Sequence, residues 1–180
     1  IATTSHTFLA TVSAIEYAGH KPIFVDIDPE TLNIDINKLK KKNLKKIKAI
    51  IAVDMHGNQC EIEEIYKLCK KNNITLIQDS SQSHGTSFDL KNPKNFIKCQ
   101  SFYPTKNLGG IAEGGCIFVN DKKFYERIYA MRDWGKINGV MIEKGFNFRM
   151  SEINAAFLKL KLGYLKHFNK KRVKLANLYK

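Results

Sequence analysis

The sequence is short of acidic side chains, and it lacks the cysteine spacings that build metal or disulfide sites. Its 180 residues contain 17 Asp and Glu against 30 Lys and Arg, which gives a formal net charge of +13. None of the four cysteines belongs to a Cys-x-x-Cys pair, and their spacings fit neither a zinc site nor a disulfide framework. We therefore expect reduced thiols in a cytoplasmic protein, and no metal.

Long apolar runs and arginine-rich stripes are also missing. No stretch is apolar enough to span a bilayer, no signal peptide is recognisable, and no aromatic-interleaved basic stripe marks a nucleic-acid groove. We expect neither a membrane nor a nucleic acid as partner. The lysines gather in runs at 38–48, 67–73 and 166–174. Such runs are typical of solvated helix and loop faces, and the alternative is a surface for an anionic partner.

The sequence has no ordinary beginning or end. It opens with IATTSHTF, without an initiator Met, and it stops inside the helical pattern KRVKLANLYK. We expect a fragment of a longer chain. With 43% hydrophobic and 11% aromatic residues, the chain is nevertheless long and apolar enough for one domain with a real core.

Helix and strand patterns alternate along the chain. Apolar residues recur at helical spacing over 10–20, 61–73, 121–135 and 151–168. Short β-rich or continuously apolar runs occupy 21–27, 48–55, 74–79, 98–103 and 115–121. The alternation predicts an α/β domain with a largely parallel sheet, in which ligands bind at the carboxyl ends of the strands.

Three side chains at predicted strand ends form a pattern suited to pyridoxal phosphate. Asp79 ends the run ITLIQD, and Ser101 and Lys106 follow the run KCQ. The cofactor's aldehyde needs a lysine amine for a Schiff base, and its pyridine nitrogen needs a carboxylate that keeps it protonated. Its phosphate needs hydroxyl and backbone N–H donors. The spacing alone is a weak signal, because any α/β protein has an Asp at some strand end.

Longer strings make the pattern specific. The strings QDSSQSHGT (78–86), SFYPTKNLG (101–109) and FNFRMSEINAA (146–156), with the opening residues 3–35, resemble the DegT/DnrJ/StrS family of sugar aminotransferases, which depend on pyridoxal phosphate. The resemblance implies the aspartate-aminotransferase-like fold (fold type I), with a mostly parallel, seven-stranded type of sheet flanked by helices. It also implies a truncated chain.

The same resemblance implies a domain division. Residues 1–150 correspond to the cofactor-binding large domain without its N-terminal part, and residues 151–180 correspond to a helical segment leading to an absent small domain. The missing upstream segment is the one whose backbone amides hold the cofactor phosphate in the family. Cofactor affinity of so short a chain is therefore in question.

Four residues take cofactor roles by the resemblance. Lys106 matches the lysine that forms the Schiff base and then moves protons, and Asp79 matches the partner of the pyridine nitrogen. Gln82 matches a glutamine at the hydroxyl face of the ring, and Ser101 matches a phosphate-binding serine.

The other candidate residues each have a structural alternative. Phe8 matches the aromatic that stacks on the cofactor ring, with a plain core residue as the alternative. Asn147 matches an asparagine that reaches the cofactor phosphate of the neighbouring subunit, which implies a homodimer with shared active sites. His84 is either structural or part of the sugar pocket, and His56, beside a turn, is favoured as structural. Trp134 is favoured as a packing residue.

The resemblance implies transamination of a nucleotide-linked keto sugar, with glutamate as the expected amino donor. The strings favour the 3-keto branch of substrates over the 4-keto branch. One alternative is a sugar dehydratase on the same scaffold, which Lys106 argues against because those enzymes replace the lysine. The other is an inactive basic α/β fragment that binds an anionic partner.

Overall fold

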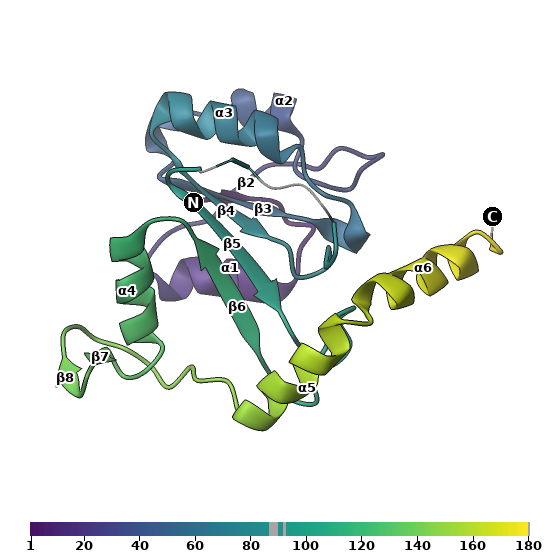
Figure 1. The fold of residues 1–180 in the computed structure, drawn as a ribbon. Helices are drawn as coiled ribbons and strands as arrows, with labels where there is room; N and C mark the ends of the chain where they lie inside the picture. Colours follow the sequence, from purple (N-terminus) through teal and green to yellow (C-terminus); the bar gives the residue numbers. More distant parts are fainter. Residues whose placement is uncertain (87–89, 92, 180) are drawn as a thin grey trace. The chain divides into compact units, whose positions relative to one another are not determined.

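The computed structural model describes residues 1–86, 90–91 and 93–179, and the chain divides into two compact units, Ile1–Ser101 and Phe102–Lys180. Figure 1 shows the elements of both. This division differs from the predicted domain boundary at 150/151, which concerns the domains of a complete enzyme and stays a prediction.

The first unit is built on a parallel sheet. Its strands are β1 (Ala2–Thr3), β2 (Ile23–Phe24), β3 (Ala49–Val53), β4 (Thr75–Asp79) and β5 (Phe96–Ser101). They lie in the order β2-β1-β3-β4-β5, and each described neighbour pair is parallel. The predicted α/β class with a mostly parallel sheet is confirmed, because described helices lie between β1 and β2, between β2 and β3, and between β3 and β4.

Helices cover both faces of this sheet. The helices of the unit are α1 (Leu9–Tyr17), α2 (Ile36–Lys40) and α3 (Ile62–Asn72), with 3₁₀ turns η1 (Leu44–Lys46) and η2 (Met55–Gly57). Ile50 and Ala52 of β3 pack in a core that includes buried residues of α2 and α3. Ile51 and Val53 pack on the other side with Ile15 of α1 (Figure 1). All five residues of β3 are buried, as expected for a strand covered on both faces.

Aspartates fix local turns and helix starts in the first unit. Asp28 accepts hydrogen bonds from the N–H groups of Glu30 and Thr31, a bonding pattern typical of an Asp that opens a turn. The bond from Thr31 is the main reason that the pKa of Asp28 lies below its ordinary value. Asp35 caps the start of α2, because its side chain accepts hydrogen bonds from the backbone N–H groups of Asn37 and Lys38.

The second unit holds one longer strand, a hairpin and three helices among its described residues. They are β6 (Gly115–Val119), α4 (Lys122–Met131), β7 (Lys136–Ile137), β8 (Val140–Met141), α5 (Glu152–Leu162) and α6 (Leu165–Ala176). Asp121 caps α4 by accepting a hydrogen bond from the Phe124 N–H.

Two predicted helices end earlier than expected. The helix predicted over 121–135 stops at Met131, because Trp134 adopts φ of 58° and donates its N–H to Phe146 instead. The helix predicted over 151–168 is two helices, α5 and α6. At the break, the N–H groups of Gly163 and Tyr164 donate to carbonyls three residues earlier, those of Leu160 and Lys161, as in a 3₁₀ helix.

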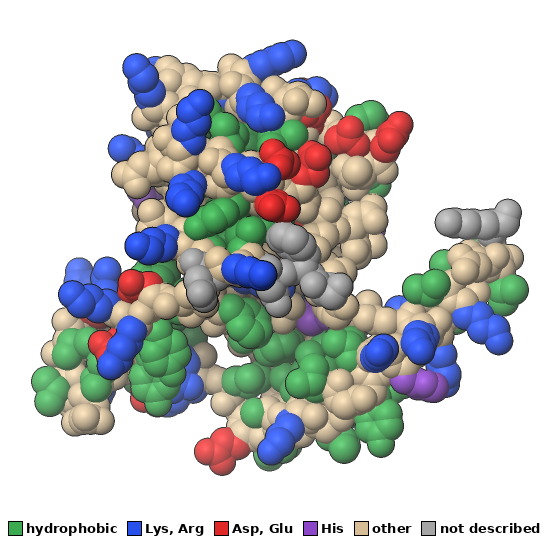
Figure 2. Space-filling view, turned by 45° about the horizontal axis from the view of Figure 1, so that its top comes forward, with side chains coloured by type: hydrophobic (Ala, Val, Ile, Leu, Met, Phe, Trp, Pro, Cys, Tyr) green, Lys and Arg blue, Asp and Glu red, His purple; other side chains and the backbone are tan. Residues whose placement is uncertain are grey.

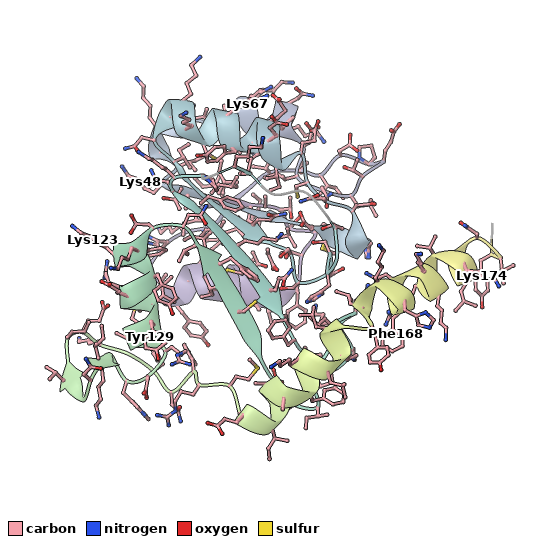
Figure 3. The ribbon with its side chains drawn as sticks, viewed as in Figure 1. Lys48, Lys67, Lys123, Tyr129, Phe168 and Lys174 are labelled. Atoms are coloured by element: carbon pink, nitrogen blue, oxygen red, sulfur yellow. The ribbon has the colours of Figure 1, made fainter. Side chains whose placement is uncertain are left out.

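The basic side chains are dispersed. Figure 2 shows Lys and Arg spread over the face drawn rather than gathered in one patch. Lys48, Lys67 and Lys174 are exposed and point away from the elements that carry them (Figure 3). Lys67 pairs with Glu64 at 2.7 Å, and this bond is the main cause of the raised pKa of Lys67. The distribution supports the interpretation of the lysine runs as solvated faces.

Within the described ranges, every helix is too short or too polar to cross a lipid bilayer.

Candidate active site

Three of the predicted cofactor residues lie at the carboxyl edge of the first unit's sheet. Asp79 ends β4, where it pairs in register with Val53 of β3 and Cys99 of β5. Ser101 ends β5, two residues beyond the partner of Asp79. Phe8 follows β1 and stands at the start of α1. A carboxylate, a hydroxyl group and an aromatic ring therefore come from the carboxyl ends of strands in one sheet, where α/β folds bind ligands.

Phe8 is not a core residue. Its exposed fraction is 73%, so the alternative that it only fills the interior is wrong. Leu9 beside it is equally exposed at 73%. A large apolar ring left uncovered at a sheet edge suits stacking on a flat ligand.

The loop after Asp79 is held by backbone and side-chain bonds. The Asp79 carboxylate accepts the Ser81 N–H at 3.0 Å. The side-chain oxygen of Gln82 accepts the His56 N–H at 2.9 Å, and its amide nitrogen lies 3.7 Å from the sulfur of Met55. The turn η2 therefore sets the orientation of Gln82. His56 reaches this position with φ of 54°, in the left-handed region, which supports its interpretation as a structural residue.

A buried carboxylate that the sequence reasoning missed supports this loop from below. Asp54, directly after β3, has no exposed surface. It accepts bonds from the Cys60 N–H at 3.0 Å, the Gln78 side-chain amide at 2.8 Å and the Ser83 hydroxyl at 2.7 Å. Asp54 thereby joins the end of β3 to β4 and to the loop that carries Gln82. The sequence signal that could have identified Asp54 is its position directly after a fully apolar strand.

Two histidines meet at the same edge. The ring centroids of His6 and His56 are 5.6 Å apart, from the loops after β1 and β3. His84 is buried, with 3% of its surface exposed. Across the residues the structure describes, no group of three or more His, Cys, Asp or Glu side chains is arranged to hold a metal ion.

Lys106 belongs to the second unit and sits on a closed loop. Its N–H donates to the Tyr103 carbonyl at 2.9 Å, which forms a tight turn. At the base of the loop, the Phe102 N–H donates to Gly114 at 2.7 Å and the Gly110 N–H donates to Phe102 at 2.8 Å. The side chain of Lys106 is partly buried. The backbone around Lys106 is therefore constrained by the hydrogen bonds that close this loop.

Asn147 lies on an exposed segment of the second unit. It pairs with Asp133 across an antiparallel bridge, and Arg149 bonds to the carboxylate of Asp133. The flanking rings of Phe146 and Phe148 stack with centroids 4.9 Å apart, and both are exposed. This segment therefore presents Asn147 and two aromatic rings at the surface, and the expected role of Asn147 in a neighbouring subunit stays a prediction.

The comparisons with known proteins agree over the whole chain. Residues 1–180 match the DegT/DnrJ/EryC1/StrS aminotransferase family. The chain is 36% identical to a pleiotropic regulatory protein of Geobacillus stearothermophilus, over 99% of this chain and 49% of that protein. It is also 36% identical to the dTDP-3-amino-3,6-dideoxy-alpha-D-galactopyranose transaminase of Aneurinibacillus thermoaerophilus, over 97% of this chain and 49% of that enzyme.

A solved structure supports the same relationship. NtdA of Bacillus subtilis, with its cofactor PMP bound, superposes with a TM-score of 0.90 at 28% identity, over 99% of this chain and 41% of that one. The chain spans about half the length of the curated relatives it matches. Since the family match extends from the first residue to the last, the chain belongs to the DegT/DnrJ/EryC1/StrS aminotransferase family.

Proposed function

We propose that the protein transfers an amino group to a nucleotide-linked keto sugar with pyridoxal phosphate as cofactor. The observation that carries the proposal is the set of side chains at the carboxyl edge of the sheet, Asp79, Ser101 and Phe8, in a chain whose lysine Lys106 sits on a closed loop. Fold and family alone would not assign a function to particular residues.

The side chains of the first unit fit the cofactor's chemistry. A carboxylate at the end of β4 can pair with a protonated pyridine nitrogen, and the hydroxyl of Ser101 can donate to a phosphate. The exposed ring of Phe8 offers a flat apolar surface. Gln82, fixed by the η2 turn, keeps its amide nitrogen near Met55 and its oxygen on the His56 N–H. Asp79, Ser101 and Phe8 thus offer a carboxylate, a hydroxyl and an aromatic ring to the cofactor.

The residues of the chain then act as follows. When bound, the cofactor supplies an electron sink for the charge left by a departing proton. Asp79 would hold a proton on the ring nitrogen. Lys106 would hold the cofactor through its amine and would act as the base that moves the proton. Glutamate is the proposed donor.

The substrate class rests on a relative's name. The Aneurinibacillus relative is a transaminase of a dTDP-linked 3-amino sugar. We accordingly propose a nucleotide-linked deoxy sugar with a keto group at position 3, with position 4 as the alternative, in amino-sugar or glycoconjugate biosynthesis. The presence of Lys106 disfavours the sugar dehydratase alternative.

The test uses the longest natural polypeptide that contains residues 1–180. Pyridoxal phosphate is added, the complex is reduced with borohydride, and the modified peptide is located by mass spectrometry. The cofactor mass should lie on Lys106, and Lys106→Ala should abolish both the modification and turnover of a keto sugar. Asp79→Asn should still be modified on Lys106 but lose turnover by orders of magnitude, because an uncharged ring is a poor electron sink. Turnover by Lys106→Ala would overturn the proposal.

We further propose a cytoplasmic homodimer with shared sites. The cysteine spacings, which fit neither a zinc site nor a disulfide framework, and the exposed segment around Asn147 support this. In a shared arrangement, a mixture of Lys106→Ala and Asn147→Ala proteins contains dimers with one intact site. Activity of the mixture should therefore exceed that of either variant alone. A mixture no more active than its components would contradict site sharing.

A further inference from the structure

The side-chain oxygen and nitrogen of Asn154 both form their hydrogen bonds with one loop. It lies on α5 with 1% of its surface exposed. Its oxygen accepts the N–H of Ile111 at 2.9 Å and of Ala112 at 3.4 Å. Its nitrogen donates to the carbonyls of Ala112 at 3.3 Å and Glu113 at 3.1 Å. An amide has two acceptor positions and two donor hydrogens, so this side chain is fully engaged.

The loop has glycines where Asn154 approaches. A Cβ at Gly110 would overlap the side-chain oxygen of Asn154. A Cβ at Gly114 would lie 3.1 Å from its nitrogen and 3.0 Å from the sulfur of Met150. Because Gly110 and Gly114 lack side chains, the buried amide of Asn154 fits between them. A larger residue at Gly110 would leave no room for this amide. The Asn and the glycines thus form one packed unit.

This packed unit lies next to Lys106 along the same loop. The two bonds of Phe102 with Gly110 and Gly114 close the loop that contains the lysine. Farther along α5, the amine of Lys161 donates to the Gly109 carbonyl at 2.8 Å. Helix α5 therefore holds the segment directly after the lysine at two points, Asn154 and Lys161, which lie about two turns apart on the helix.

We propose that Asn154 is a positioning residue for the amine of Lys106. The proposal rests on the function proposed for Lys106 and adds how that lysine is held in place. Asn154 fixes the 110–114 stretch, and the closed loop transmits this order to the lysine. A reacting group displaced by about 1 Å can lose on the order of a hundredfold in rate. The loop therefore needs an anchor, and α5 provides it through the buried amide.

The experiment compares Asn154→Ala, Asn154→Asp and the exposed control Lys159→Ala, which lies on the same helix. In the longest natural polypeptide containing residues 1–180, hydrogen exchange of the 109–115 peptide reports the anchor without any ligand. The rate of attachment of pyridoxal phosphate to Lys106, followed by absorbance and borohydride trapping, reports the amine. Melting temperature, measured on each variant without cofactor, separates general destabilisation from loss of positioning.

We expect Asn154→Ala to raise exchange of the 109–115 peptide at least tenfold and to slow attachment about ten- to a hundredfold. Asn154→Asp keeps the acceptor oxygen and the size, but its second oxygen faces the carbonyls of Ala112 and Glu113 and repels them. It should disturb both rates at least as much as Asn154→Ala, and the variant that its melting temperature shows to be folded supplies the comparison. Lys159→Ala should leave both rates unchanged.

The outcomes distinguish this inference from the proposed function. If the unsubstituted protein never attaches pyridoxal phosphate to Lys106, the proposed function fails, and the positioning role fails with it. If the unsubstituted protein attaches it and both Asn154 variants attach it at the same rate, the function stands and the positioning role is overturned. Unchanged exchange of the 109–115 peptide in the variants would overturn the anchor itself.

Discussion

At the scale of single residues, the buried carboxylate of Asp54 has the largest predicted effect. Asp54→Ala would leave the donors of Cys60, Gln78 and Ser83 without their acceptor. Each buried donor left unpaired costs about 1–3 kcal/mol, so we expect a loss of ~3 kcal/mol or more in the free energy of unfolding. Denaturant unfolding of the polypeptide measures it.

Two further variants serve as comparisons for Asp54→Ala. Asp54→Asn keeps one acceptor oxygen, and the Ser83 hydroxyl can rotate to accept, so it should lose less than Asp54→Ala. Asp121→Ala removes an exposed helix cap and should lose only about 1 kcal/mol. An Asp54→Ala protein no less stable than Asp121→Ala would show that the network contributes little.

Two cysteines give a pH-dependent prediction. Burial raises the pKa of Cys69 to about 12, and burial followed by the nearby Asp54 raises that of Cys60. The native thiols should therefore resist iodoacetamide at pH 8 and react only after unfolding. Because the folded pKa is raised, their contribution to stability is complete below the ordinary value of 9.0 and is lost as the pH rises towards 12. Mass spectrometry of alkylated peptides checks this, and rapid native labelling of Cys69 would contradict it.

At the scale of elements, two glycines with different surroundings should respond in opposite ways. A Cβ at Gly109 would overlap the backbone of Pro104 and Tyr103 in the lysine turn, and backbone cannot move aside cheaply. Gly109→Ala should lose about 1–3 kcal/mol. Gly163, between α5 and α6, has φ of −59° and its nearest neighbour at 3.5 Å, so Gly163→Ala should be neutral or gain about 0.5–1 kcal/mol. Thermal unfolding of both variants tests the contrast, and equal effects would refute it.

The elements also show how far sequence patterns reach. The apolar run at β3 depends on neighbouring residues, so the pattern predicted this strand correctly. The positions of Asp79 and Ser101 followed from where their strands end. Asn154 acts on residues 41 to 43 positions away, and no local pattern encodes such a contact.

Other misses have equally physical reasons. The end of α4 depends on the bond between Trp134 and Phe146, which is formed only when the hairpin folds back. The helix break at Gly163 was invisible to apolar spacing, because the pattern continues through it. The roles of Lys106 and Asn147 came from family strings, since a lysine in a glycine-rich loop has no chemical signature in periodicity.

At the scale of the whole molecule, the chain spans about half the length of its curated relatives. Several large apolar side chains of its last two helices are exposed, among them Leu160, Val173 and Leu175. We predict that residues 1–180 expressed alone fold poorly, aggregate and bind pyridoxal phosphate weakly. Losing two charge-assisted phosphate bonds of about 1.5–3 kcal/mol each would weaken binding by a hundredfold or more. Light scattering and a cofactor titration test this, and tight stoichiometric binding with keto-sugar amination would contradict it.

The position of β1 in the sheet has a consequence for how the molecule opens. Only the pairs Ala2–Ile23 and Thr3–Phe24 join β2 to β1, and Ala2–Ile50 joins β1 to β3, whereas β3 and β4 share five pairs. The sheet is therefore strongly paired between β3 and β4 and weakly paired at β1 and β2. Transient fraying should separate β2 from β1 while β3 and β4 remain closed. A protease that samples such openings should cut the chain first at the exposed Lys21 or Phe24, and not within the buried strand β3.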